Sequence, residues 1–302
     1  MSAKGLSENS YVTKLIDIYY HKPAISKPSI IAQPKSKNFA IVGTAFDYLT
    51  RFLIESTNKD KTTTRNSWVL EAAPMNLLAE AKIRKEALIE LDEYHTIIQD
   101  AKKVYSSCRK TGSIVEDDIV SILKLAPFEH YFRCMILGHD YRDINQNDIE
   151  DIRNLLDIFH NKLWVANHHV VINPCFGEGS LLVGGADIDM VIDDMLLDVK
   201  TTQKFFEAKH LRQMIIYYFL YRIGGIEGCE YYNDPEAIKK LGLYYSRYGE
   251  LVQINIADII TEKSYKIFES LLKYYLDTSL EYFDEDDLYE DNALPLDDES
   301  EF

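Results

Sequence analysis

Two apolar, strand-like stretches at residues 182–192 and 195–201 are separated by only two residues, Asp193-Asp194. A two-residue connection predicts a β-hairpin, and it sets the register because each strand residue then has a defined partner. Ile192 is expected to pair with Met195, and, further from the turn, Asp189 with Asp198. This hairpin restricts the fold more than any other feature of the chain.

Side chains alternate along a strand, so the four charged residues Asp187, Asp189, Asp198 and Lys200 are expected on one face, with Asp187 opposite Lys200. Directly opposed Cβ atoms lie roughly 4.5–5.5 Å apart. Asp189 and Asp198 could therefore share a cation, and Mg²⁺ or Mn²⁺ suits such oxygen ligands. Lys200 would add a positive charge where a phosphate can lie, which predicts a centre that hydrolyses phosphodiester bonds.

The alternative is a solvated strand face, because an Asp-x-Lys triplet is common and exposed ion pairs on an antiparallel strand stabilise little. The tight turn, the clustering of acids on one face and the apolar residues elsewhere favour a functional site. Those apolar residues are Ile188, Met190, Ile192, Met195, Leu197 and Val199.

The rest of the chain divides by pattern into a mainly helical first half and a mixed second half. An amphipathic stretch at 11–20 is followed by a Pro/Ser/Lys-rich loop at 21–37. Helices are expected at 43–55, 115–125, 148–162, 205–222 and 262–276, and one long helix or a helical hairpin at 76–109. Further strands are expected at 169–173, 241–247 and 251–256. We therefore expect an α/β (α+β) fold with a small mixed sheet flanked by helices. Residues 1–163 would pack on or contribute to a core at 164–280.

The net charge of −16 is unusual for a protein that handles nucleic acid. The negative charge argues less strongly against nucleic-acid binding because much of it lies in one segment. Residues 281–302 hold eleven Asp or Glu and no Lys or Arg. The preceding part carries only about −5. The acidic tail is expected to be disordered, and it or the helical first half could bind a protein partner.

The sequence shows no charged-then-apolar leader and no apolar run of membrane-spanning length, so we expect a cytoplasmic protein without membrane contact. The cysteines Cys108, Cys134, Cys175 and Cys229 are widely spaced, which argues against structural zinc. His168-His169 occupies adjacent strand positions that face opposite ways, so we interpret it as structural.

Asp189 and Asp198-Val199-Lys200 resemble the PD-(D/E)xK nuclease superfamily, with Ile188 in place of the proline of its name. Asp187 is a rival for the first aspartate, but the register favours Asp189. Gln213-Met-Ile-Ile-Tyr217, on the following helix, resembles the Gln-x-x-x-Tyr of RecB-type exonucleases and similar CRISPR-associated nucleases. A Tyr-rich core helix is the alternative interpretation of that segment.

Members of that subgroup also carry a Gly-x-x-x-His helix, to which Gly43-Thr-Ala-Phe-Asp47 is similar with Asp in place of His. Asp47 could equally be a first-turn helix acid. The four-cysteine pattern of the relatives that hold an iron–sulphur cluster is missing, so no cluster is expected.

The resemblance implies a restriction-endonuclease-like core and a Mg²⁺- or Mn²⁺-dependent nuclease acting on DNA more than RNA, in phage defence, repair or recombination. The implied catalytic residues are Asp189, Asp198, Lys200, Gln213 and Tyr217, and the implied metal ligands are Asp189, Asp198, Val199, Asp187 and Asp47. Lys204, Lys209, Arg212 and Arg247 are candidates for substrate contact or are ordinary surface cations. A catalytically silent module of the same fold and an acidic interaction protein are the two alternatives.

Overall fold

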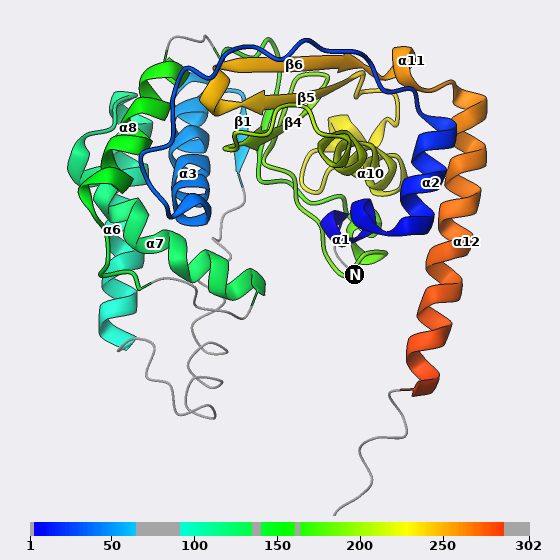
Figure 1. Cartoon of the computed structure of the whole chain (residues 1–302), viewed down its shortest axis with the longest axis horizontal. Helices are drawn as coiled ribbons and strands as arrows, with labels where there is room; N and C mark the ends of the chain where they lie inside the picture. The colour runs from blue at the N-terminus through cyan, green and yellow to red at the C-terminus, as the bar shows by residue number, and fades with distance from the viewer. Residues whose placement is uncertain (1–2, 65–90, 135–139, 161–163, 287–302) are drawn as a thin grey trace, which may run out of the picture.

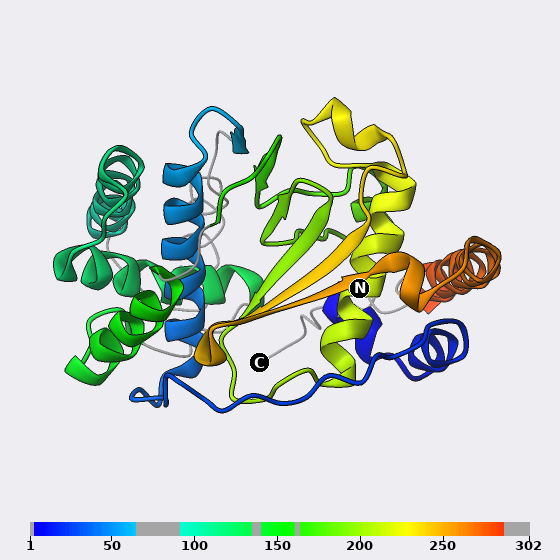
Figure 2. The same cartoon turned by 90° about the horizontal axis from the view of Figure 1, so that it is seen from above.

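A computed structural model describes residues 3–64, 91–134, 140–160 and 164–286. A six-stranded mixed sheet lies between two layers of helices (Figures 1 and 2). The strands, in their spatial order, are β1 (Thr62–Thr64), β2 (Val170–Ile172), β3 (Met190–Ile192), β4 (Met195–Lys200), β5 (Lys240–Tyr245) and β6 (Glu250–Asn255). The expected small mixed sheet flanked by helices is confirmed.

The strand directions follow from the connections. β2, β3 and β4 form antiparallel pairs, whereas β4 and β5 run parallel, and β5 and β6 are antiparallel again. A parallel pair requires a crossover, and helix α10 (Ala208–Gly224) supplies it between β4 and β5. β4 therefore lies inside the sheet with a hydrogen-bonded neighbour on each side.

Each face of the sheet is covered by its own helical layer. On one face α3 (Phe39–Thr57) contacts the sheet, and α6 (Leu91–Thr111), α7 (Glu116–Cys134) and α8 (Gln146–His160) pack against α3. On the other face α10 contacts the sheet, α1 (Ala3–Glu8) and α2 (Ser10–Tyr19) pack against α10, and α12 (Glu262–Asp286) packs against α2. Strand alternation divides the two cores: Val191 and Leu196 face α10, while Met190 and Leu197 face the α3 side. Short helices α9 (Glu178–Leu181), η1 (Glu230–Asn233), η2 (Ser246–Tyr248) and α11 (Ile256–Ile259) connect these elements.

The described residues among the first 163 contribute to both layers. Helices α1 and α2 pack on α10 and α12, and the expected loop after α2 then runs along the β6 side of the sheet to reach α3 (Figure 1). The backbone N–H groups of Ile31 and Ala32 donate to the carbonyl of Arg247 at 2.9 and 3.0 Å. Residues 76–90, expected to begin the helix that ends as α6, lie outside the described residues.

The hairpin has the predicted register, with Ile192 opposite Met195 and Met190 opposite Leu197. Asp193 adopts φ 50° in the turn, a conformation that aspartate tolerates better than most residues. Its carboxylate accepts hydrogen bonds from the backbone N–H groups of Asn167, His168 and His169. These bonds fix the turn against the strand before it, and they give the His168-His169 segment a structural role.

The expectation of a continuous strand at 182–192 is wrong, because only the last three residues of that stretch are strand. Gly184 and Gly185 have φ of 68° and 110°, which strands do not use. The Ser180 hydroxyl accepts from the backbone N–H of Phe176 and donates to the carbonyl of Ala186, closing a loop there. Asp187 is left in an isolated bridge with Cys175.

The C-terminal helix continues past the boundary that the sequence predicted at residue 280. α12 ends at Asp286, so the first part of the acidic segment expected to be disordered is helical. The remainder of that segment, 287–302, lies outside the described residues. Among the helices that the structure describes, none combines the length and apolarity needed to cross a bilayer.

The contact between α9 and α10 leaves no room for side chains at its two glycines. A Cβ atom on Gly179 would lie 2.2 Å from the Leu220 carbonyl oxygen, and one on Gly224 would lie 1.9 Å from that of Phe176. We expect Gly179→Ala to lower the free energy of unfolding by about 1–3 kcal/mol in a urea titration, because backbone atoms would have to move.

Gly43→Ala in α3 is the matched control. A Cβ there would lie 3.8 Å from that of Thr201, an ordinary contact, and alanine is favoured inside a helix. This variant should retain its stability or gain up to about 1 kcal/mol. Equal stabilities of the Gly179 and Gly43 variants would contradict the predicted backbone clash.

Candidate functional site

Asp198 and Lys200 lie at the end of β4, and a chain of contacts extends from them into α10. The Lys200 Nζ is 2.6 Å from the Asp198 Oδ2. It donates a hydrogen bond of 2.8 Å to Gln213 Oε1, and the Gln213 Nε2 donates to the Tyr217 hydroxyl at 3.0 Å. Gln213 and Tyr217 are one turn apart on a helix face, so the structure brings four of the predicted residues together.

Asp189, the residue immediately before β3, reaches the same place. Its Oδ2 accepts a hydrogen bond of 2.6 Å from the backbone N–H of Val199, the residue between Asp198 and Lys200. The last pair of the ladder, Met190 with Leu197, is one step away, as the predicted register requires. Val199, predicted as a metal ligand, thus contacts the first aspartate directly through its backbone N–H.

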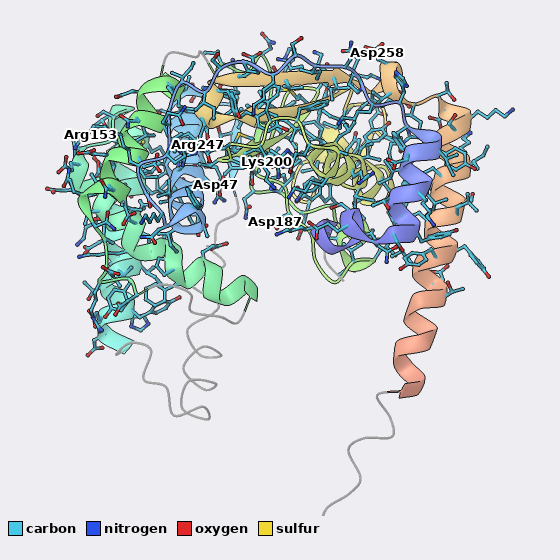
Figure 3. The ribbon with its side chains drawn as sticks, in the orientation of Figure 1. Asp47, Arg153, Asp187, Lys200, Arg247 and Asp258 are labelled. Atoms are coloured by element: carbon cyan, nitrogen blue, oxygen red, sulfur yellow. The ribbon has the colours of Figure 1, made fainter. Side chains whose placement is uncertain are left out.

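Helix α3 brings Asp47 into this centre, although more than 140 residues separate it from Asp189 in the sequence. Gly43, one turn before Asp47, packs against Thr201 at the end of β4. Asp47 pairs with Arg51, one turn later on the same helix. Figure 3 shows Asp47, Asp187 and Lys200 between the two helical layers.

The centre combines several carboxylates with restricted access to water. Burial, and then the carboxylates of Asp47 and Asp198, raise the pKa of Asp189 well above its usual value. Burial likewise raises the pKa of Tyr217, with smaller contributions from Asp198, Asp189 and Asp187, so that its hydroxyl stays protonated. Arg51 and Lys200 compensate the negative charge only in part.

The donors in this centre are carboxylate oxygens, which are the ligands that Mg²⁺ and Mn²⁺ prefer. Within the described ranges, however, no three His, Cys, Asp or Glu groups are arranged as a ready-made metal site. Two of the acids are instead paired with cations, Asp47 with Arg51 and Asp198 with Lys200. The carboxylates fit a hard cation when the Arg51 and Lys200 side chains move away from them and free their oxygens for the metal.

Three of the four cations predicted to contact substrate lie on the surface around the start of α10. Lys204 and Lys209 lie 3.7 and 3.5 Å from carboxylate oxygens of Glu207. Arg212 binds the Asp17 carboxylate of α2, with the shortest N···O distance 2.8 Å. Surface pairs of this kind exchange readily, so these three side chains remain accessible to a phosphate.

The prediction that Arg247 contacts substrate is wrong. Its side chain is 1% exposed and forms two hydrogen bonds with the Asp151 carboxylate, at 2.8 and 3.1 Å. The same carboxylate accepts from the backbone N–H of Ser36 in the loop before α3. Arg247 therefore joins the sheet to α8 and to this loop, and is not available to a ligand.

We expect Asp151→Ala to lower the free energy of unfolding by about 3–5 kcal/mol, because it leaves the Arg247 charge buried without a partner. Asp151→Ala combined with Arg247→Met removes both charges and should recover much of that loss. Chemical denaturation of the two variants measures the difference. Similar unfolding free energies for the single variant and the wild type would contradict the structural role of the pair.

Arg51 and His210 also belong to this region, and neither was among the predicted site residues. An Asp47–Arg51 spacing of one turn was the available signal for Arg51. His210 is buried, with its Nδ1 2.9 Å from the Tyr245 hydroxyl. Burial, and then the positive charge of Lys200, lower the pKa of His210 to about 4, so its ring is neutral at pH 7.

This shift predicts a pH dependence of stability. Between pH 6.5 and about 4 the unfolded chain binds a proton at His210 and the folded chain does not. The free energy of unfolding should therefore fall as the pH is lowered through that window, by up to about 2 kcal/mol from this group. Urea titrations at several pH values check this, and His210→Gln should show a shallower decline. Parallel pH profiles for the two proteins would refute it.

No family model, no curated protein and no solved structure matches the chain. A function can therefore be argued only from the geometry of the site and from the residue pattern that it contains. Fold alone would not decide it, because one architecture supports many activities.

Proposed function

We propose that this protein is a metal-dependent nuclease of the PD-(D/E)xK type, with a restriction-endonuclease-like core. The observation that carries the proposal is the convergence of four separate elements, α3, the end of β3, β4 and α10, on one centre. The residues that they contribute are Asp47, Asp189, Asp198, Lys200, Gln213 and Tyr217. A solvated strand face would not be expected to gather the motif residues of three different segments.

The arrangement of the sheet supports the same proposal. The hairpin with the acids and the lysine lies within a small mixed sheet, and the helix with Gln213 and Tyr217 follows directly as the crossover. Helix α3, on the opposite face, carries Asp47 where the resemblance implies a ligand from an early helix. Asp in place of His supplies an oxygen donor in place of a nitrogen donor, which suits a hard cation.

The chain's own residues would perform distinct tasks in phosphodiester hydrolysis. Asp47, Asp189 and Asp198 would hold the cation, with Asp189 kept in place by the Val199 N–H. Bound Mg²⁺ or Mn²⁺ would supply Lewis acidity and an activated water. Lys200, oriented by Gln213, would place its charge on the phosphoryl oxygens as negative charge develops there.

DNA is the proposed substrate, in phage defence, repair or recombination. Support for DNA over RNA and for these settings comes from the resemblance of the motifs alone. The chemistry of the centre requires a phosphodiester and does not distinguish the two sugars.

The test is to incubate purified protein with linear and circular duplex DNA, single-stranded DNA and RNA, in Mg²⁺, Mn²⁺ or EDTA. We expect cleavage that requires the metal, and a loss of at least about a hundredfold in Lys200→Ala, because a charge aimed at the phosphate is removed. Lys266→Ala, which changes an exposed lysine on α12, is the control and should cleave normally.

Two outcomes would contradict the proposal. One is the absence of metal-dependent cleavage of every substrate, which would favour a catalytically silent module of this fold. The other is equal cleavage by Lys200→Ala and the wild type.

A further inference from the structure

A cavity of about 320 Å³ opens beside Lys200, on the side of the sheet covered by α1 and α10. It shares Lys200 and Gln213 with the carboxylate centre. Its lining comes from three segments: Lys4, Ser7 and Glu8 of α1, Val199 to Thr202 at the end of β4, and Lys209, His210 and Gln213 of α10. The N-terminal helix thus forms one wall of a space that ends at the proposed reaction centre.

The polar groups of this cavity suit a phosphate. Three lysine side chains, Lys4, Lys200 and Lys209, line it together with hydroxyl groups, and Glu8 is the one acid in its lining. Lys209 is also 3.5 Å from Glu207 outside the lining, and Lys200 is held beside Asp198. In a chain with a net charge of −16, a cavity whose lining holds three ammonium groups and one carboxylate suits an anion that displaces the Asp198 and Glu207 contacts of Lys200 and Lys209.

The volume limits what the anion can belong to. Small-molecule sites measure roughly 300–1,000 Å³, so this cavity, at about 320 Å³, lies at the lower end. At this volume it has room for one nucleotide unit and not for the two paired strands of a duplex. His210 adds a flat ring to the lining, against which a base or sugar can pack.

We propose that this cavity binds a phosphate-bearing nucleotide unit of a single nucleic-acid strand, next to the bond that is cleaved, with Lys4 and Lys209 contacting its phosphate. The assignment rests on the proposed nuclease function and adds the substrate form: the strand must be unpaired where it enters. It also makes the N-terminal helix part of the substrate site.

The first test measures cleavage kinetics of a single-stranded oligodeoxynucleotide by Lys4→Gln and Lys209→Gln. Each change removes one charged hydrogen bond to phosphate, so KM should rise about tenfold while kcat stays the same. The salt dependence of binding should weaken by about one unit of slope. Lys14→Gln, an exposed lysine on the neighbouring α2 that does not line the cavity, is the control and should behave as the wild type.

The second test needs no catalysis. Binding of deoxyadenosine monophosphate, deoxyadenosine and inorganic phosphate is measured by calorimetry in EDTA. The monophosphate should bind more tightly than either part alone, and about tenfold more weakly to Lys4→Gln and Lys209→Gln than to Lys14→Gln.

The two tests separate the two proposals. Monophosphate binding that depends on Lys4 and Lys209, without any cleavage, would support the cavity as a nucleotide site and overturn the nuclease. Metal-dependent cleavage with all three lysine variants equal to the wild type, in KM and in binding, would overturn the cavity assignment and leave the nuclease standing. A monophosphate that binds no better than phosphate would also overturn the nucleotide assignment.

Discussion

The hydrogen bond from the Val199 N–H to the Asp189 carboxylate is the interaction on which the candidate centre depends. It places the first acid against the strand that carries Asp198 and Lys200, and the two-residue turn maintains this alignment. Acids so close together repel one another in a poorly hydrated place. Lys200 and Arg51 offset the repulsion, and a cation would offset it further. The rigid position of β4 inside the sheet prevents the acids from separating.

The sequence predicted features that depend on residues close together in the chain, and it failed for features that depend on distant residues. The hairpin register depended on two adjacent residues and was correct for the three pairs from Ile192–Met195 to Met190–Leu197, beyond which the ladder ends before the expected Asp187–Lys200 pair. The α/β class, which depended on local periodicity, was also correct. The strand at 182–189 failed because Val and Leu there suggested a strand, while Gly184 and Gly185 require a loop. The burial of Arg247 could not be anticipated, since its partner Asp151 is 96 positions away and the flanking tyrosines suit exposed and buried sites alike.

The approach of α3 to the hairpin was expected from the motif resemblance, but no local sequence pattern predicted it. Nothing local to Gly43 or Asp47 indicates that α3 approaches Thr201 and Asp189, and only a resemblance in motif order suggested it. The same limit applies to α1, whose contact with α10 makes Lys4, Ser7 and Glu8 a wall of the cavity beside Lys200. Long-range packing of this kind is decided by which helix face is apolar, and a single sequence does not say which element covers that face.

For the binding of a nucleic acid, the positions of the charged residues matter more than the net charge of the chain. A net charge of −16 would repel a nucleic acid, but much of it lies in the acidic segment after residue 280. Screening removes most of that repulsion beyond about 8–10 Å at physiological salt. An approaching phosphate responds to the groups within that distance, which at the cavity include Lys4, Lys200 and Lys209 and the carboxylates of Glu8, Glu207 and Asp198. The acids deeper in the centre suit the proposed metal ion, and the lysines at the cavity suit the proposed phosphate. Groups of opposite charge would thus bind the metal and the substrate of the same reaction.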